Sequence, residues 1–259
     1  MANQEYVLGR GKVNFARFTD GTTTQADGFR YLGNTPSFST TTASDTLDHY
    51  SADAGLKVKD KSVTLQVNRT GSFTCDNITG DNLALVVNGT VGSVIGTSGT
   101  ALTETKSLFK SRSYQIGVTA NNPSGLRKLT NFVLKTTGGS PATVAMTGNY
   151  TIDLTRGILT ILDSPLAITD GTSYTLQYDT LANTREQIVS KNLTIYGAIQ
   201  FLADNAVGKN RDYLLPYVKL SPNGDYSLKG DEWQVMTFDL EILKLDDNTE
   251  AMYIDGQPV

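Results

Sequence analysis

The chain contains one histidine, His49, and four carboxylates lie close to it in the sequence: Asp45, Asp48, Asp53 and Asp60. A histidine among carboxylates can act as a general base or as a metal ligand, because its pKa lies near neutrality and its ring nitrogens bind cations. The segment therefore raises two questions, whether it catalyses a reaction and whether it holds a metal.

Nucleophilic catalysis finds little support elsewhere in the chain. A catalytic triad would have to combine a Ser or Thr with His49, since there is no second histidine. The G-x-S-x-G elbow is missing, and the spacing in Gly96–Thr100, GTSGT, is different. Most metal sites built on histidine use more than one strong ligand. We interpret His49 as a partly exposed loop histidine that neither catalyses nor binds metal.

Other polar clusters also have simpler explanations than chemistry. Paired carboxylates can hydrolyse glycosides, but Asp231-Glu232 and Asp246-Asp247 are typical of turns and solvated edges. The oxygen-rich run Asp76–Asn82 lacks the spacing of an EF-hand calcium loop, and the capping of a helix explains it better. The sequence therefore predicts no enzyme, no cofactor and no metal site.

The composition of the chain describes a protein rich in turns and polar strands. Of its 259 residues, 39% are hydrophobic and 19% charged. The single cysteine, Cys75, excludes an internal disulfide and is best explained as a buried, unreactive thiol. No apolar run approaches the roughly 20 residues of a membrane span, and the N-terminus lacks the apolar core of a signal peptide. We therefore expect neither a membrane span nor a signal peptide.

Charge is distributed unevenly along the chain. The net charge is −4, and the residues from Lys191 onward include six basic and eleven acidic ones, a local net charge of −5. Binding to nucleic acid by neutralising phosphates needs clustered Lys and Arg. This balance argues against a general DNA-binding protein.

Alternating apolar and polar residues predict the elements that position these side chains. In Val13–Phe18 the pattern places Val13 and Phe15 on one face. In Lys61–Asn68 it predicts an inward face, and Trp233–Leu245 is expected to be a core strand that includes Trp233. The inward residues expected in Lys61–Asn68 are Val63, Leu65 and Val67. About a dozen such segments predict an all-β fold.

One segment, Thr79–Gly89, has helical spacing instead. Leu83, Val86 and Val87 follow the i, i+3, i+4 pattern, and Thr79 or Asp81 can cap the start. We expect one short helix whose apolar face packs on a sheet through Leu83, Val86 and Val87, because a helix of this length is not stable alone.

The middle of the chain predicts a separate module. Residues 111–182 contain Gly- and Pro-rich loops and a hairpin with its turn at Thr155–Gly157. We expect an inserted, Ig-like β-sandwich there, and a discontinuous larger domain from residues 1–110 and 183–259. In that larger domain the Ser- and Thr-rich run Pro36–Tyr50 alternates only weakly, which is typical of an edge strand or projecting hairpin.

The order of features resembles the major tail tube protein of long-tailed, siphophage-type bacteriophages. The resemblance rests on Tyr31–Asn34 (YLGN), on Asp48–Asp60 (DHYSADAGLKVKD) and on Asp76–Leu85, where a strand runs into the helix. It also rests on the Pro-x-Val-x-Leu-x-Pro strand at Pro216–Pro222. The middle of the chain departs from the compact form of that family.

The resemblance implies a fold and a function. Tail tube proteins are similar in fold to the type VI secretion tube protein, a β-sandwich or partial barrel with one flanking helix. Six subunits form a ring, rings stack into a tube, and DNA passes through the lumen without specific binding. Implied partners are further copies of the chain, tail terminators and the tape measure protein, with no membrane. The implied location is the virion tail, after synthesis in the bacterial cytoplasm.

For the opening segment, the resemblance implies a loop or hairpin that reaches the next ring. Small residues at Ala52, Ala54 and Gly55 would allow a close approach and a sharp bend. The implied contact residues are Asp45, Asp48, His49, Tyr50, Ala52, Asp53, Gly55, Lys57, Lys59, Asp60 and Lys61. The terminal segments Met1–Lys12 and Asp246–Val259 are further candidates for contacts between rings.

Two other classes of function stay open at this point. The inserted module would suit a cell-surface or carbohydrate-binding β-sandwich, which exposed aromatic clusters would favour. A β-rich hydrolase that uses paired acidic residues is the third possibility.

Overall fold

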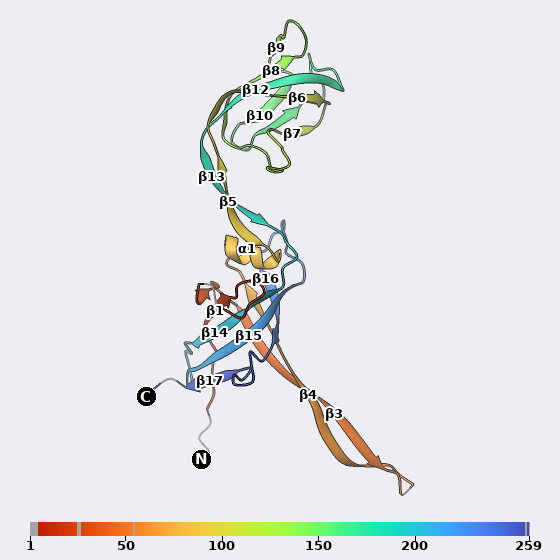
Figure 1. Cartoon of the computed structure of the whole chain (residues 1–259), viewed down its shortest axis with the longest axis vertical. Coiled ribbons are helices and arrows are strands. Elements are labelled where there is room, and N and C mark those ends of the chain that lie inside the picture. Colours follow the sequence, from red (N-terminus) through yellow and green to blue (C-terminus); the bar gives the residue numbers. More distant parts are fainter. Residues whose placement is uncertain (1–4, 25–26, 54, 257, 259) are drawn as a thin grey trace. The chain divides into compact units, whose positions relative to one another are not determined.

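The computed structural model describes residues 5–24, 27–53, 55–256 and 258, and these form an all-β fold with one short helix (Figure 1). Seventeen strands and one α-helix are present among them. The chain divides into two compact units, one formed by Met1–Gly92 with Ile188–Val259 and the other by Ser93–Gln187. The expectation of an all-β fold with a single helix is confirmed.

The first unit is built on one antiparallel sheet with the strand order β2-β1-β14-β15-β16-β4-β3, and β17 also pairs with β15. Its strands are β1 (Gly11–Arg17), β2 (Arg30–Tyr31), β3 (Ser37–Ser51), β4 (Val58–Cys75), β14 (Ile195–Ala203), β15 (Arg211–Asn223), β16 (Met236–Ile242) and β17 (Tyr253–Gly256). Strand β3 ends the order on one side and the two-residue β2 ends it on the other.

One face of this sheet is the core of the first unit. In β16, residues Met236, Phe238 and Leu240 are buried and alternate with exposed Asp239 and Glu241. Aromatic rings continue this layer across the sheet: Phe238 stacks on Phe73 with centroids 5.0 Å apart, and Phe38 meets Phe73 edge-on at 6.4 Å. Burial of such rings is the main stabilising contribution to this unit.

The helix α1 (Gly80–Val86) lies against this core. Thr79 is its N-cap, and the Thr79 Oγ1 accepts a hydrogen bond from the Asn82 backbone N at 3.3 Å, as the capping interpretation predicts. Leu83 and Val86 pack on the core as expected, but Val87 lies just past the helix and is 36% exposed. Leu85, which the sequence prediction missed, is buried in the same core, and Asn82 and Ala84 of the helix are buried too.

The buried side chain of Asn82 joins the helix to the neighbouring strand ends. Its Nδ2 donates to the backbone oxygens of Leu32 and Asn77, both at 2.8 Å, and its Oδ1 accepts from Arg30 Nη1 at 2.8 Å. Cys75, the last residue of β4, is buried beside it, and burial raises the pKa of its thiol. The prediction that the cysteine is buried is confirmed.

The second unit consists of two sheets that share one core. The four-stranded sheet has the order β6-β12-β8-β9 and the three-stranded sheet β10-β11-β7. Leu134 and Leu176 from one sheet and Leu159 and Ile161 from the other belong to the same buried cluster. The strands are β6 (Gly99–Leu108), β7 (Ser113–Gln115), β8 (Leu129–Thr136), β9 (Thr143–Val144), β10 (Tyr150–Asp153), β11 (Ile158–Ile161) and β12 (Thr172–Thr180).

The boundaries of the second unit differ from the sequence-based ones. Strand β6 pairs with β12 along most of its length, so it belongs to the inserted unit, whereas the sequence interpretation left it in the larger domain. Strands β5 (Thr90–Gly96) and β13 (Asn183–Val189) form a two-stranded ribbon in which the chain passes from one unit to the other and back. The apolar alternation of β6 alone could not indicate which sheet it would join.

Candidate assembly surfaces

The segment with His49 and its carboxylates forms a long β-hairpin. Strands β3 and β4 pair from Ser37–Thr74 to Ser51–Val58, while β16 pairs with β4 only as far as Arg69. From Ala43 to Ser51 the two strands continue without a third strand among the described residues (Figure 1). At about 3.3 Å per residue, this ribbon extends about 30 Å beyond the sheet.

Both faces of the ribbon are open to solvent. The sequence pattern predicted that Val63, Leu65 and Val67 point inward, but their exposed fractions are 48%, 66% and 44%. That prediction is wrong because no layer of the first unit covers β4 beyond Arg69. Other apolar residues of the hairpin are exposed as well: Leu47, Tyr50, Leu56 and Val58.

Short polar contacts hold the two strands of the ribbon in register. Asp48 accepts a hydrogen bond from Ser62 Oγ at 2.6 Å and is ion-paired with Lys59 Nζ at 2.6 Å. The contacts with Lys59 and Ser62 lower the pKa of the Asp48 carboxyl. Two register shifts, between Asp45 and Thr46 and between His49 and Tyr50, add β-bulges that twist the ribbon.

His49 takes part in the same pattern of cross-strand contacts. It lies in β3 rather than in a loop, its Nδ1 is 2.6 Å from Asp60 Oδ1, and its side chain is 71% exposed. A catalytic base or metal ligand needs a pocket or further ligands, and no cluster of three or more His, Cys, Asp or Glu suited to a metal occurs among the described residues. The geometry supports a structural interpretation of His49.

The structure places the predicted contact residues in one hairpin. Those in β3 are Asp45, Asp48, His49 and Tyr50; those in β4 are Lys59, Asp60 and Lys61; and Ala52, Asp53, Gly55 and Lys57 lie in the connection between them. Ala54 falls outside the described residues. A Cβ added at Gly55 would meet nothing within 4 Å. The fold of the hairpin therefore does not require glycine there.

The terminal segments Met1–Lys12 and Asp246–Val259 were further candidates for contacts between rings. Residues 1–4, 257 and 259 lie outside the described part of the chain. Glu5 forms ion pairs with Lys209 at 2.6 Å and with Arg211 at 3.5 Å, so the start of the described chain is tied to the β14–β15 connection. In the C-terminal segment, Tyr253–Gly256 adds β17 alongside β15.

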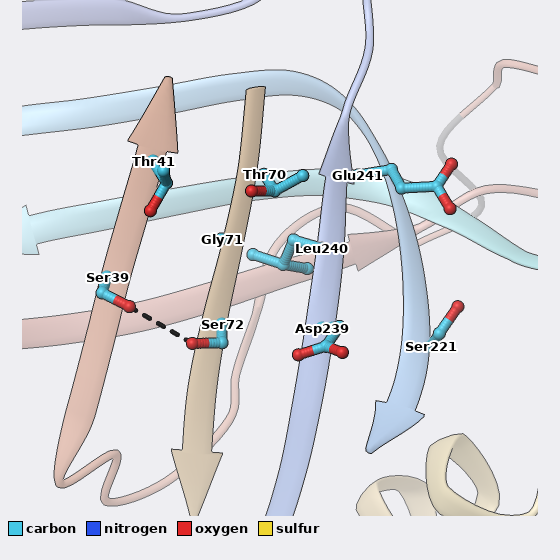
Figure 2. A pocket seen from close by; sticks show the side chains of 9 residues that line it. All are labelled: Ser39, Thr41, Thr70, Gly71, Ser72, Ser221, Asp239, Leu240 and Glu241. Carbon is cyan, nitrogen blue, oxygen red and sulfur yellow. Dashed lines mark hydrogen bonds between the residues drawn. The ribbon is translucent and has the colours of Figure 1, made fainter. Parts of the chain in front are cut away.

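The second face of the first sheet is polar over β3, β4 and β16, whereas over β1, β14 and β15 it carries a small buried cluster around Phe18 and Tyr217. A hollow of about 470 Å³ lies on this polar part. Figure 2 shows the side chains that line it, with Ser and Thr from β3 and β4 and acidic residues from β16. Ser39 and Ser72 share a hydrogen bond of 3.2 Å across the two strands. Its lining residues are Ser39, Thr41, Thr70, Gly71, Ser72, Ser221, Asp239, Leu240 and Glu241.

Two of the eleven acidic residues that follow Lys191 lie on this polar face. Asp239 accepts a hydrogen bond from Asn223 Nδ2 at 2.9 Å, and Glu241 forms an ion pair with Lys219 Nζ at 2.7 Å. The contact with Glu241 raises the pKa of Lys219. Lys219 offsets the negative charge of Glu241. The polarity of this face therefore comes more from hydroxyl groups than from net negative charge.

These features define the class of protein: an all-β chain of two units, one of which bears an exposed hairpin and a polar sheet face. The family model described as "Protein of unknown function UCP028589" matches residues 6–253, and the chain belongs to that family. No curated protein matches the sequence. Within the described residues, no helix has the length and apolar character needed to cross a membrane.

Proposed function

We propose that this protein is the structural subunit of a bacteriophage tail tube, in which copies form rings, with six subunits each, that stack around a channel for DNA. The observation that carries the proposal is the uncovered β3–β4 hairpin. Two-stranded ribbons are marginally stable in water, yet this one is long, continuous and rich in exposed apolar side chains. A surface of this kind is explained if another copy covers it.

The edge of the sheet supports the same proposal. Strand β3 ends the strand order of its sheet, so its outer backbone groups have no strand partner among the described residues. Natural proteins cover or blunt such edges, and pairing with an identical neighbour around a closed ring removes them. A projecting hairpin can then reach the adjacent ring, which is the role proposed for residues Asp45–Lys61.

The polar face suits a channel wall. A tube that conducts DNA must not bind phosphate tightly, and clustered Lys or Arg would do so. The face lined by Ser39, Ser72, Asp239 and Glu241 offers hydroxyls and carboxylates instead, with Lys219 neutralised by its ion pair. In this proposal the first unit surrounds the channel, and the second unit, Ser93–Gln187, is a decoration module.

Partners and location follow from the proposal. The main partner is a further copy of the chain, and tail terminator and tape measure proteins would contact the ends and interior of the tube. Double-stranded DNA would pass through without specific binding. The protein would be made in the bacterial cytoplasm and would end in the virion tail.

Electron microscopy of concentrated purified protein tests this function. We expect hollow tubes or six-fold rings of uniform diameter. A strictly monomeric protein at high concentration would contradict the proposal, and glycan-array binding by that monomer would instead favour a carbohydrate-binding module. Sedimentation velocity over a range of concentrations gives an independent measure of the same association.

A further inference from the structure

The connection between β15 and β16, residues 224–235, holds a tryptophan in solvent; we call it the tryptophan loop. Trp233 is 94% exposed and Leu228 is 82% exposed. This contradicts the expectation that Trp233 belongs to a core strand, because β16 begins only at Met236. Large exposed apolar side chains of this kind, Trp above all, are typical anchors of protein interfaces.

The tryptophan loop is held in shape by its own hydrogen bonds. Tyr226 Oη donates to Gln234 Oε1 at 2.9 Å, and Gln234 Nε2 donates to the backbone oxygen of Ser227 at 2.8 Å. The ring of Tyr226 also packs against the core of the first unit. Trp233 therefore adjoins Gln234, which these hydrogen bonds hold in place. The loop loses little conformational entropy when a partner encloses Trp233.

A hollow of about 620 Å³, which we call the aromatic hollow, lies beside the start of β15. Phe38, Phe201 and Tyr213 line it, with centroids 6.0 Å apart for both Phe38–Phe201 and Phe201–Tyr213. Among the described residues that line it, Arg10 is the only charged one. An aromatic wall beside a guanidinium is well suited to an indole ring, because edge-to-face and cation–π contacts both stabilise it.

The charges of the two surfaces are complementary. Asp231 and Glu232 immediately precede Trp233 in the tryptophan loop, and Asp225 adds a third carboxylate against the single Lys229. An indole that entered the aromatic hollow would therefore bring carboxylates close to Arg10. An ion pair formed there would fix the orientation of the contact.

The two surfaces lie at opposite ends of one strand. Tyr213 is near the start of β15 and Asn223 is its last residue, a separation of about 33 Å at the usual rise per residue. A surface at one end that fits a different surface at the other end makes a head-to-tail contact between copies. Such a contact builds a ring if the rotation closes and a filament if it does not.

We propose that Trp233 of one copy inserts into the aromatic hollow of the next copy, with Asp231 or Glu232 paired to Arg10. This inference rests on the proposed function, since it assumes that copies of the chain assemble, and it assigns the surfaces through which they do so. The contact does not use the part of the β3–β4 hairpin that extends beyond the sheet. The β3 residues that line the aromatic hollow, Phe38, Ser39 and Thr40, pair with β4 inside the sheet.

Disulfide trapping tests the contact directly. The only native cysteine, Cys75, is buried, so disulfides between introduced thiols can be detected without interference from it. One variant carries Glu232→Cys, which keeps the indole of Trp233 and the carboxylate of Asp231. A second carries Thr35→Cys in the lining of the aromatic hollow, and a control carries Thr23→Cys at an exposed site outside that lining. Under mild oxidation we expect covalent dimers when the first two variants are mixed, and none when either is mixed with the control.

The outcomes separate the inference from the proposed function. If the wild-type protein forms tubes but Glu232→Cys and Thr35→Cys do not cross-link in them, the inference is wrong and the function stands. If the wild-type protein stays monomeric and no cross-link forms, both are wrong. Disulfide dimers from Glu232→Cys alone would mean a symmetric contact, which also overturns the head-to-tail arrangement.

Substitutions give a second measurement. Trp233→Ser should raise the protein concentration needed for assembly at least about 30-fold, the loss typical of an interface anchor. Its fold should not change, because Trp233 makes almost no buried contact. Arg10→Glu should also weaken assembly, and Glu232→Arg in the same chain should restore part of it. Equal assembly by wild type and Trp233→Ser would overturn the inference.

Discussion

Shortening the β3–β4 hairpin gives the most direct test of the candidate assembly surface. Ser44 and Val67 are paired partners, so Asp45–Gln66 can be replaced by Asn-Gly, which favours a two-residue turn between antiparallel strands. The replaced segment contains every predicted contact residue. It lies beyond Arg69, where the pairing of β4 with β16 ends.

The expected effect on folding is small. The residues removed are almost all exposed and contribute none of the buried core of the first unit. Changes at such positions usually alter the free energy of unfolding by about 0.5 kcal/mol or less each way. We therefore expect the thermal midpoint of the shortened protein to stay within a few degrees of that of the wild type, measured by circular dichroism.

The expected effect on assembly is large. Six exposed apolar side chains are lost, with exposed fractions between 48% and 76%: Leu47, Tyr50, Leu56, Val58, Val63 and Leu65. At about 2 kcal/mol for full burial of each, covering their exposed parts would contribute about 7 kcal/mol per copy before association costs. If those costs offset two thirds of it, about 2 kcal/mol remains, and the concentration needed for assembly rises roughly 30-fold.

Negative-stain electron microscopy and sedimentation velocity measure this outcome over a concentration series. Thr23→Ala, at an exposed position outside the hairpin, is the control. Tubes formed by the shortened protein at wild-type concentrations would refute the assignment of the hairpin as an assembly surface. Loss of folded structure in the shortened protein would refute the argument that the hairpin lies outside the core.

Three further predictions follow from individual contacts. His49→Ala should keep the fold and change the free energy of unfolding by less than about 1 kcal/mol, as for other exposed pairs; unfolding in urea measures this. Because its pKa is lowered in the folded state, Asp48 should stabilise the ribbon above the ordinary carboxyl pKa and lose that effect as pH falls through the lowered value. Hydrogen exchange of the hairpin amides should show this in the wild type and not in Asp48→Asn. Asn82→Ala should destabilise the first unit by about 2 kcal/mol in urea, because one buried and one partly buried backbone acceptor lose their donor.

Each of these predictions has a contradicting result. Stoichiometric heat of metal binding that His49→Ala abolishes would show that the structural interpretation of this residue is wrong. Equal pH dependence of exchange in wild type and Asp48→Asn would mean that other groups titrate. An unchanged urea midpoint for Asn82→Ala would mean that water replaces the lost amide at no net cost.

Sequence patterns predicted the core strands of the first unit well. Alternation in Val13–Phe18 and in β16 correctly gave the buried faces that contain Phe15 and Phe238. The cap at Thr79 was also predicted, because the side-chain oxygen and the amide that it satisfies are three residues apart. Local patterns of this kind are encoded within a few residues of one another.

The same kind of pattern failed where burial depends on distant segments. Leu65 alternates with polar neighbours just as Phe73 does in the same strand. Only Phe73, however, lies where β16 pairs with β4, and only Phe73 is buried. The segment Trp233–Leu245 was predicted as one core strand, but the strand begins only at Met236, three residues after Trp233. Strand β6 likewise pairs with β12 in the second unit, whereas the sequence interpretation assigned it to the larger domain.

The sequence by itself determined the all-β class, the single capped helix and the absence of a recognisable catalytic motif around His49, because these depend on residue types and short spacings. Only the tertiary structure decided that the segment around His49 is a ribbon open on both faces, and that Trp233 stands in solvent at the far end of β15 from an aromatic hollow. Whether an apolar residue is core or interface depends on which other strands arrive to cover it, and no local pattern contains that information.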